Sequence, residues 1–193
     1  AFAGLGGGSA DVAALLRCLR RLYAAGMPDE ALRAIGLTVG SDVPFCVSGG
    51  TSLAEGRGER LTDLPPLPVC QIVLCKPDFG ISTPELFVLA DGAVLSKRPD
   101  IAGLTAALQG GELTGVTDRL CNVFEEFLPE RYREVFRIKE ILLAHGALNA
   151  AMSGSGPTVY GIFESAAEAQ RAAEVLKKSY QQTYVAKPVK KLV

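Results

Sequence analysis

Apolar residues recur at helical spacing close to the start of the chain, on one stripe that comprises Val12, Leu15, Leu16, Leu19, Leu22 and Tyr23. Ser9 is of a type that often caps a helix N-terminus, and Asp11 would follow in the first turn, where negative charge is favoured. The pattern therefore predicts an amphipathic helix over residues 9–25.

The next residues predict short elements and then a boundary. Pro28-Asp29-Glu30 would open a second helix that Gly36 closes. Residues 40–45 have the composition of a loop, residues 51–54 that of a strand, and residues 56–59 that of a turn. Three prolines among residues 65–68 exclude a helix or a central strand, so we expect a domain boundary there.

The remainder alternates between strand-like and helix-like patterns. A β-rich run covers residues 69–75, and Ser82-Thr83-Pro84-Glu85 is typical of a helix start. The further expected elements are an exposed loop at 91–98, helices at 101–108, 120–127 and 129–145, strands at 148–152 and 158–163, a helix at 166–180 and a strand at 183–186. This order fits a split βαβ sheet of ferredoxin-like type. The predicted fold class is α+β (α/β two-layer), with domains at 1–64 and 65–193.

Composition narrows the class of protein. The chain has 193 residues, of which 48% are hydrophobic and 21% charged, as in one large or two small globular domains. Its 20 basic and 21 acidic side chains give a formal charge of −1, which offers no basic excess for nucleic acid. No apolar run approaches the roughly 18–20 residues that cross a bilayer, so we expect no membrane partner.

Cysteine and histidine give no sign of a metal site. The five cysteines are odd in number, and their spacings match no zinc pattern. Three of them (Cys18, Cys70 and Cys75) lie in apolar stretches, which favours buried, reduced thiols in a cytoplasmic protein. The single His145 is expected to be the last residue of a helix rather than a catalytic base.

The first candidate for chemistry is the glycine-rich loop Gly4-Leu5-Gly6-Gly7-Gly8-Ser9, which runs into the first predicted helix. Backbone N–H groups at a helix N-terminus form an anion site, and the Ser9 hydroxyl could bond a phosphate or Mg²⁺. The loop is neither a Walker A nor a dinucleotide fingerprint. The alternative is tight packing of the loop. Only three residues precede it and none is Met, so we expect a fragment whose missing part belonged to the same site.

Two further segments complete the candidate site. Asp42 lies in a Gly/Pro-rich segment, where it is either a solvated turn or capping residue or a carboxylate that takes a proton from a substrate hydroxyl. Met152-Ser153-Gly154-Ser155-Gly156-Pro157-Thr158 is either a hairpin turn or a second anion nest that faces the first across a domain cleft. Two glycine-rich loops with an acid between them in sequence suggest phosphoryl transfer.

These segments also carry a resemblance. Residues 4–11 resemble the second motif of the GHMP small-molecule kinases, and residues 152–157 resemble the third. Within that superfamily the chain resembles the 4-diphosphocytidyl-2-C-methyl-D-erythritol kinase family through four further segments, namely residues 40–45, 56–59, 77–84 and Asn122 ahead of Phe124-Glu125. The resemblance implies part of a GHMP N-terminal domain followed by a ferredoxin-like C-terminal domain.

The resemblance implies ATP-dependent phosphorylation of the 2-hydroxyl of a cytidylyl methylerythritol in non-mevalonate isoprenoid synthesis, with Mg²⁺. Asp42 would be the catalytic acid/base. The loop of Gly4, Leu5, Gly6, Gly7, Gly8 and Ser9 would hold the ATP phosphates, with Ser9 also on Mg²⁺. The expected substrate-binding residues are Thr83, Ser153, Gly154, Ser155 and Gly156. Ala10 stands where many members have a second serine.

The resemblance also implies that about the first hundred residues, with a first motif and a catalytic lysine, are absent, so we expect the 193-residue chain alone to be inactive. The expected enzyme is a cytoplasmic monomer or homodimer. Three alternatives stay open: another GHMP kinase that acts on a different alcohol, a non-catalytic nucleotide-binding protein, and an isolated folding unit without activity.

Overall fold

The computed structural model describes residues 3–92, 94–96 and 98–189 and divides into two compact units. The helical unit is Gly6–Pro66 with the described part of Val189–Val193, and the sheet unit is Leu67–Pro188 with the described part of Ala1–Leu5. Each is a body with its own core. The predicted domain limits, 1–64 and 65–193, stay a prediction.

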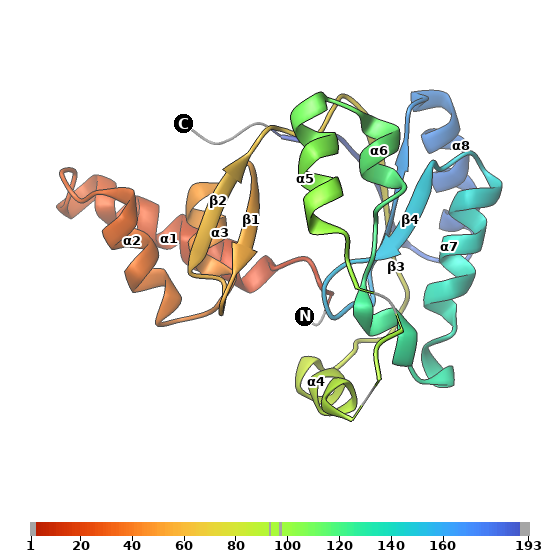
Figure 1. Cartoon of the computed structure of the whole chain (residues 1–193), viewed down its shortest axis with the longest axis horizontal. Coiled ribbons are helices and arrows are strands. Elements are labelled where there is room, and N and C mark those ends of the chain that lie inside the picture. Colours follow the sequence, from red (N-terminus) through yellow and green to blue (C-terminus); the bar gives the residue numbers. More distant parts are fainter. Residues whose placement is uncertain (1–2, 93, 97, 190–193) are drawn as a thin grey trace. The chain divides into compact units, whose positions relative to one another are not determined.

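The helical unit packs three helices beside a two-stranded hairpin (Figure 1). Its elements are α1 (Gly7–Tyr23), α2 (Asp29–Leu37), α3 (Val43–Ser48), β1 (Thr51–Glu55) and β2 (Arg60–Leu64). The buried hydrophobic cluster within this unit is small: it joins Ala13, Leu32, Val43 and Val47, one or two from each helix.

The sheet unit is a two-layer α+β domain. Its strands are β3 (Gln71–Lys76), β4 (Asn149–Met152), β5 (Val159–Phe163) and β6 (Gln182–Ala186), in the all-antiparallel order β4-β5-β3-β6. Its helices are α4 (Thr83–Asp91), α5 (Ile101–Gly110), α6 (Leu113–Thr117), η1 (Val123–Phe127), η2 (Glu130–Tyr132), α7 (Glu134–Ala144) and α8 (Ala166–Lys177). The order of elements and strands is that of a ferredoxin-like sheet, as predicted.

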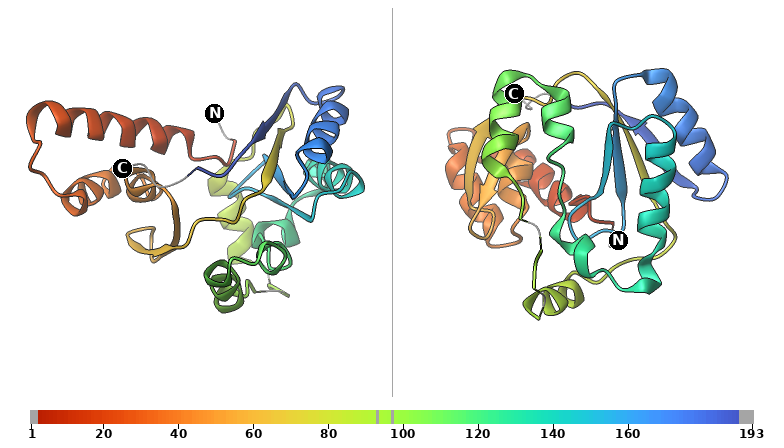
Figure 2. Two further views of the ribbon diagram at one scale, coloured as in Figure 1. Left: turned by 90° about the horizontal axis from the view of Figure 1, so that it is seen from above. Right: turned by 45° about the vertical axis from the view of Figure 1, so that its right-hand side comes forward.

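Helices α7 and α8 lie side by side along one face of the sheet, as both views in Figure 2 show. Helix α8 turns Ala169, Ala172, Ala173 and Leu176 inward, and the i, i+3, i+4, i+7 spacing of these residues makes one apolar face. Small alanine side chains let the helix approach the sheet closely. Ser165 caps the helix by accepting from Glu168 N at 3.4 Å.

The first helix differs from the prediction at both of its ends. Helix α1 begins at Gly7 rather than at Ser9, because Gly6 takes the N-cap position in a left-handed conformation (φ 62°, ψ 22°). Ser9 therefore lies inside the first turn and makes no capping bond, and Asp11 falls outside that turn. The helix also ends at Tyr23, two residues earlier than expected.

Several other elements differ from the sequence predictions. Residues 43–48 form α3 rather than a loop, because Pro44 suits a first helical turn and Val43 and Val47 are buried one turn apart. Strand β2 and helix α6 were not predicted, and the helix expected at 120–127 is the 3₁₀ helix η1. The helix expected from Pro129 is η2 followed by α7.

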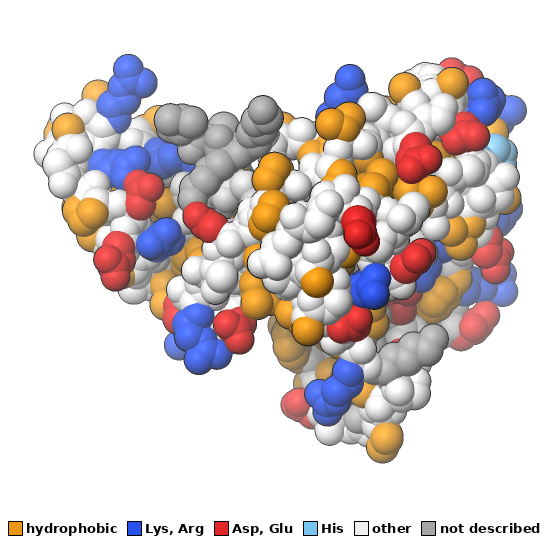
Figure 3. Space-filling view, turned by 45° about the horizontal axis from the view of Figure 1, so that its top comes forward, with side chains coloured by type: hydrophobic (Ala, Val, Ile, Leu, Met, Phe, Trp, Pro, Cys, Tyr) orange, Lys and Arg blue, Asp and Glu red, His pale blue; other side chains and the backbone are white. Residues whose placement is uncertain are grey.

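The remaining features are the charged side chains, the cysteines and the single histidine. Basic and acidic side chains are interspersed over the face shown in Figure 3. Within the described ranges, no helix combines the length and apolarity that a bilayer crossing needs. Cys70 and Cys75 are buried as expected, but the prediction for Cys18 is wrong, because its side chain is exposed. His145 is the C-cap of α7, and its ring Nδ1 lies 2.7 Å from Ile141 O.

Candidate functional site

The N-terminus of α1 is a backbone anion site within the helical unit. Ala10 N donates to Gly6 O at 2.9 Å, and this is the first hydrogen bond of the helix. The N–H groups of Gly7, Gly8 and Ser9 precede it and have no acceptor within the helix. No side chain caps this end, and its first turn holds no acidic residue. A side chain built on Gly7 or Gly8 would meet nothing within 4 Å, so open space adjoins these groups. The helix dipole adds partial positive charge at the same place.

Asp42 lies beside this helix end. A Cβ placed on Gly6 would stand 4.0 Å from Asp42 Oδ2, and one placed on Gly40 would stand 3.8 Å from Ser9 Oγ. The fold thus brings Gly6, Ser9 and Asp42 together, although Asp42 follows Gly6 by 36 positions in the sequence.

The carboxylate of Asp42 is not used by the fold. Asp42 occupies the N-cap position of α3, yet its side chain makes no capping bond. Among the described residues it has no hydrogen bond or ion pair, and it is exposed. Its negative charge helps to raise the pKa of the Cys46 thiol, after burial, which has the larger effect. The side chain of Asp42 is therefore not a cap, whereas a solvated residue and a carboxylate that takes a proton both fit the geometry, so its catalytic role stays a prediction.

The turn between β1 and β2 holds the segment before Asp42. Gly58 packs on the carbonyl oxygen of Ser41, which leaves no room for a side chain. Glu59 Oε2 accepts from Arg57 N at 2.6 Å, and backbone hydrogen bonds to its own N–H and that of Arg57 hold the pKa of Glu59 below its usual value. The turn is thus stabilised from within.

The second predicted loop lies in the sheet unit, between β4 and β5. Ser153 N donates to Thr158 O at 2.8 Å and Gly156 N to Ser153 O at 2.8 Å, which closes a compact turn. The hydroxyls of Ser155 and Thr83 lie 2.7 Å apart. All five predicted substrate-binding residues are therefore close together in one unit.

Gly4 belongs to that second loop by packing. Ser153 Oγ donates to Gly4 O at 2.6 Å, and a Cβ on Gly4 (φ +74°) would stand 2.2 Å from Ser153 O. Gly4 and Leu5 are part of the sheet unit, whereas Gly6 starts the helical unit. The loop predicted as one phosphate-binding segment is thus divided between two bodies, and close backbone packing explains why position 4 is glycine. The idea that the two loops face each other stays a prediction.

Mg²⁺ fits the donors at α1. Mg²⁺ at phosphoryl-transfer sites is usually held by one or two protein oxygens together with phosphates of the substrate, so it needs no all-protein cage. Ser9 Oγ and the carboxylate of Asp42 are hard oxygen donors of that kind. Within the described ranges no group of three or more His, Cys, Asp or Glu side chains could hold a metal on its own.

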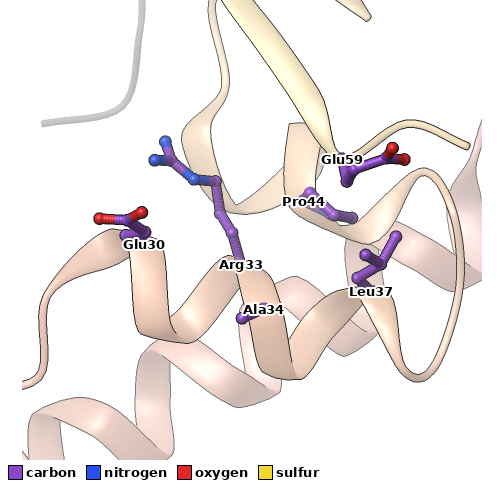
Figure 4. Close-up of a pocket in the computed structure, with 6 residues that line it drawn as sticks. All are labelled: Glu30, Arg33, Ala34, Leu37, Pro44 and Glu59. Carbon is purple, nitrogen blue, oxygen red and sulfur yellow. The ribbon is translucent and has the colours of Figure 1, made fainter. Parts of the chain in front are cut away.

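A pocket of about 220 Å³ opens elsewhere in the helical unit (Figure 4). Its lining residues are Glu30, Arg33, Ala34, Leu37, Pro44 and Glu59. None of the predicted site residues lines it, and Arg33 Nη1 is engaged by Ser48 Oγ at 3.2 Å. This pocket therefore does not enter the assignment of the site.

Two residues of the sheet unit were noticed in the sequence only as part of a resemblance. Asn122 Nδ2 donates to Gly154 O at 2.8 Å, and Glu125 contacts the last residue of β4. Apart from that resemblance, the signal was an Asn just ahead of the segment that forms η1, a position where Asn caps helical turns.

Family models match both parts of the chain. The model described as GHMP kinases N terminal domain matches residues 1–50, and the model described as GHMP kinases C terminal matches residues 104–182. The fold is shared with solved homoserine kinase from Cytophaga hutchinsonii (TM-score 0.75, 19% identity, 98% of this chain and 67% of that chain). At that identity the likeness shows the fold alone.

Closer relatives share one name. The chain is 39% identical over 187 residues to 4-diphosphocytidyl-2-C-methyl-D-erythritol kinase of Clostridium acetobutylicum, covering 97% of this chain and 67% of that one. It is 43% identical over 189 residues to the enzyme of the same name from Enterococcus faecalis, covering 97% and 66%. A crystal structure of 4-(cytidine 5'-diphospho)-2C-methyl-D-erythritol kinase matches with TM-score 0.78 at 31% identity, over 97% of this chain and 66% of that chain.

The chain thus spans about two thirds of the length of the relatives that it matches. Identity near 40% extends over 97% of this chain. On these grounds the chain belongs to the 4-diphosphocytidyl-2-C-methyl-D-erythritol kinase family of the GHMP kinases.

Proposed function

We propose that the full-length gene product transfers the γ-phosphoryl group of ATP to the 2-hydroxyl of 4-diphosphocytidyl-2-C-methyl-D-erythritol. The observation that carries the proposal is the Asp42 carboxylate, which lies at the positive end of α1 and has no hydrogen-bond or ion-pair partner among the described residues. A carboxylate that the fold does not use, beside an anion site, suits phosphoryl transfer.

In this proposal the N–H groups of Gly7, Gly8 and Ser9 bind ATP phosphate oxygens. Asp42 orients the substrate hydroxyl and accepts its proton as the hydroxyl oxygen bonds to the γ-phosphorus, and the bond from that phosphorus to the bridging oxygen of ADP breaks. Ser9 Oγ would hold Mg²⁺ when the ion is bound, and the ion would supply positive charge to the phosphates. The protein otherwise positions the reactants, which can be worth about 7–11 kcal/mol of the barrier.

We propose that Thr83 and the Ser153–Gly156 loop bind the acceptor substrate. Support comes from the 2.7 Å contact between the Thr83 and Ser155 hydroxyls, which presents two polar groups at one place. The predicted cytoplasmic location and the monomer or homodimer state are part of the same proposal.

The test is steady-state kinetics of the full-length gene product with Asp42→Asn. Asn keeps the size of the side chain but cannot take the proton, so turnover should fall roughly 10²–10⁴-fold. ATP affinity, measured by calorimetry, should change little. Asp118→Asn removes an exposed carboxylate in the other unit and is the matched control, which should keep full turnover.

Gly7→Val is the complementary variant. Its side chain would enter the open space beside the helix end, so the fold should tolerate it while the phosphates lose room. ATP binding should weaken. An active Asp42→Asn enzyme would remove the catalytic assignment, and unchanged ATP binding by Gly7→Val would remove the assignment of the anion site.

A further inference from the structure

The last residue of β4 has both backbone groups held from outside the sheet. Met152 pairs with Val159 of β5, and the next pair, Ser153 and Thr158, exchanges a hydrogen bond. Since bonded and non-bonded pairs alternate in an antiparallel ladder, the N–H and C=O of Met152 point away from β5. Glu125 Oε1 accepts from Met152 N at 2.6 Å, and Asn122 Nδ2 donates to Met152 O at 2.8 Å.

Asn122 uses its amide in a way that no other side chain of its size could. Besides Met152 O, its Nδ2 donates to Gly154 O at 2.8 Å, so two N–H groups meet two carbonyl oxygens. Its Oδ1 accepts from Phe124 N at 3.0 Å and caps η1. An acid at this position could keep the cap but would set a negative charge against both carbonyls.

Glu125 is fixed from its other side. Its Oε2 pairs with Lys139 of α7, and the Glu125 and Lys139 side chains are only 14% and 22% exposed. A carboxylate that is ion-paired and mostly buried is a rigid acceptor for Met152 N. Asn122 and Glu125 together therefore fix where β4 ends and the Ser153–Gly156 loop begins.

The loop that starts at this point leaves two of its amides without a partner among the described residues of the fold. Gly154 and Gly156 have positive φ (+54° and +72°), and a Cβ on Gly156 would stand 2.3 Å from Met152 Sδ. Gly156 N is bonded to Ser153 O, whereas no hydrogen bond from Gly154 N or Ser155 N is present in the described part of the chain. Two successive amides without a partner, next to the Ser155 hydroxyl, are donors of the kind that anion-binding backbone nests use.

We propose that Asn122 and Glu125 are positioning residues for this loop, and that they hold its free amides and the Ser155 hydroxyl in the geometry that binds the acceptor substrate. The proposal rests on the proposed function for the identity of the substrate. Neither residue needs to touch the substrate, because each acts through the backbone of Met152 and Gly154.

The test uses Asn122→Asp and Asn122→Ser, which both keep a capping oxygen for η1 and lose the amide donors. Asn149→Asp is the matched control. Asn149 lies at the other end of β4, where it donates to Thr117 O at 2.7 Å and accepts from Ala150 N at 2.8 Å. Asn149→Asp therefore removes an amide donor of the same kind at a site away from the loop.

The first readout is amide hydrogen exchange of the 193-residue chain. Both Asn122 variants should raise exchange at the hydrogen-bonded amides of Ser153, Gly156 and Thr158 by about tenfold, as expected for losing hydrogen bonds to the loop. Exchange over α8 should not change, and Asn149→Asp should leave residues 153–158 as in the wild type. Wild-type exchange at the loop in both Asn122 variants would overturn the proposal.

The second readout is steady-state kinetics of the full-length gene product. The Asn122 variants should raise KM for the acceptor alcohol about tenfold or more while KM for ATP stays within twofold, and Asn149→Asp should raise neither. An acceptor KM that is unchanged, or that rises equally in Asn149→Asp, would reduce Asn122 to a structural role and overturn the proposal. If the wild type does not phosphorylate this alcohol, the proposed function fails, while the exchange data still decide whether Asn122 positions the Ser153–Gly156 loop.

Discussion

The backbone of Gly58 lies against the carbonyl oxygen of Ser41, so close that a Cβ on Gly58 would stand 2.3 Å from that oxygen. Gly58 also has a φ of +107°, a conformation that side chains rarely adopt. Ser41 directly precedes the proposed catalytic Asp42, so the turn between β1 and β2 supports the backbone from which that carboxylate projects.

Gly58→Ala should therefore destabilise the helical unit by about 1–3 kcal/mol, from strain and the clash with Ser41. Chemical denaturation of the 193-residue chain measures this. Gly26→Ala is the control, since a Cβ there meets nothing within 4 Å and its φ is not positive. Equal stability of the two variants would show that the contact with Ser41 is unimportant.

The helical unit should exchange its amide hydrogens faster than the sheet unit. Its buried cluster joins four hydrophobic residues, whereas the cluster of the sheet unit draws on β3, β4, β5, α7 and α8. Residues 6–61 should thus be less protected than residues 69–189, because opening them exposes less apolar area at about 25 cal/mol per Å². Equal protection in both regions would contradict this.

The exposed residues of the apolar stripe on α1, which are Leu15, Leu19, Leu22 and Tyr23, should contribute little to the stability of this chain. Leu15 is 58% exposed and Leu22 71% exposed, while Leu32 of α2 is 2% exposed. Leu22→Lys should change the free energy of unfolding by less than about 0.5 kcal/mol, and Leu32→Ala should cost about 2–5 kcal/mol. A large loss from Leu22→Lys would mean that the stripe is covered in solution.

Thiol labelling should divide four of the five cysteines into a fast and a slow pair. Cys18 and Cys121 are exposed and should react quickly with a maleimide at neutral pH. Cys70 and Cys75 are 2% and 0% exposed, and burial raises the pKa of both thiols, to about 11 for Cys75, so they should react only after unfolding. Cys18→Ser with Cys121→Ser should abolish the fast phase; a fast phase that survives would point to opening of the core.

Acid should weaken the cap of α5. Asp100 Oδ1 accepts from Gly103 N at 2.9 Å and Oδ2 from Arg119 Nε at 3.0 Å, and these bonds, the first above all, hold the pKa of Asp100 below its ordinary value of 3.8. Since the folded pKa is the lower one, the charged cap stabilises the fold at pH above 3.8, and this stabilisation is lost as pH falls through the folded pKa.

Asp100→Asn keeps a capping oxygen but does not titrate. Its melting temperature should lie below that of the wild type at neutral pH, and the difference should shrink as pH falls below 3.8. Melting curves between pH 2 and 7 measure it. A difference that is constant over this range would show that the charge of Asp100 does not act on the folded state.

Local patterns predicted the sheet unit well and the helical unit less well. β3 to β6 and α8 were predicted because their apolar residues follow a local pattern that is visible in the sequence, such as the apolar run Val159–Phe163 and the helically spaced alanines of α8. Helix α3 was missed because Gly40, Ser41 and Pro44 dominate the local composition. What makes it helical is burial of Val43 and Val47 in a cluster with α1 and α2, which the local sequence does not express.

The candidate site shows the same division. Residue types alone pointed to Asp42 and to both glycine-rich loops, because glycine, serine and a carboxylate in loops suit phosphate chemistry. The approach of Asp42 to Gly6 and the bonds from Asn122 to Met152 and Gly154, which span 30 and 32 positions, exist only in the folded chain. The sequence likewise could not reveal that Gly4 packs on Ser153.

The side-chain hydrogen bonds to β4 also make the two edge strands of the four-stranded sheet differ in how readily they could pair with another chain. At the β4 edge Asn122 and Glu125 occupy the outward groups of Met152, and Asn149 occupies the N–H of Ala150, so an extended segment that approaches would find them already bonded. β6, at the opposite edge, has no such cover among the described residues. Edge-to-edge aggregation of partly unfolded molecules should therefore begin along Gln182–Ala186. A proline or lysine substituted into this strand should reduce that aggregation.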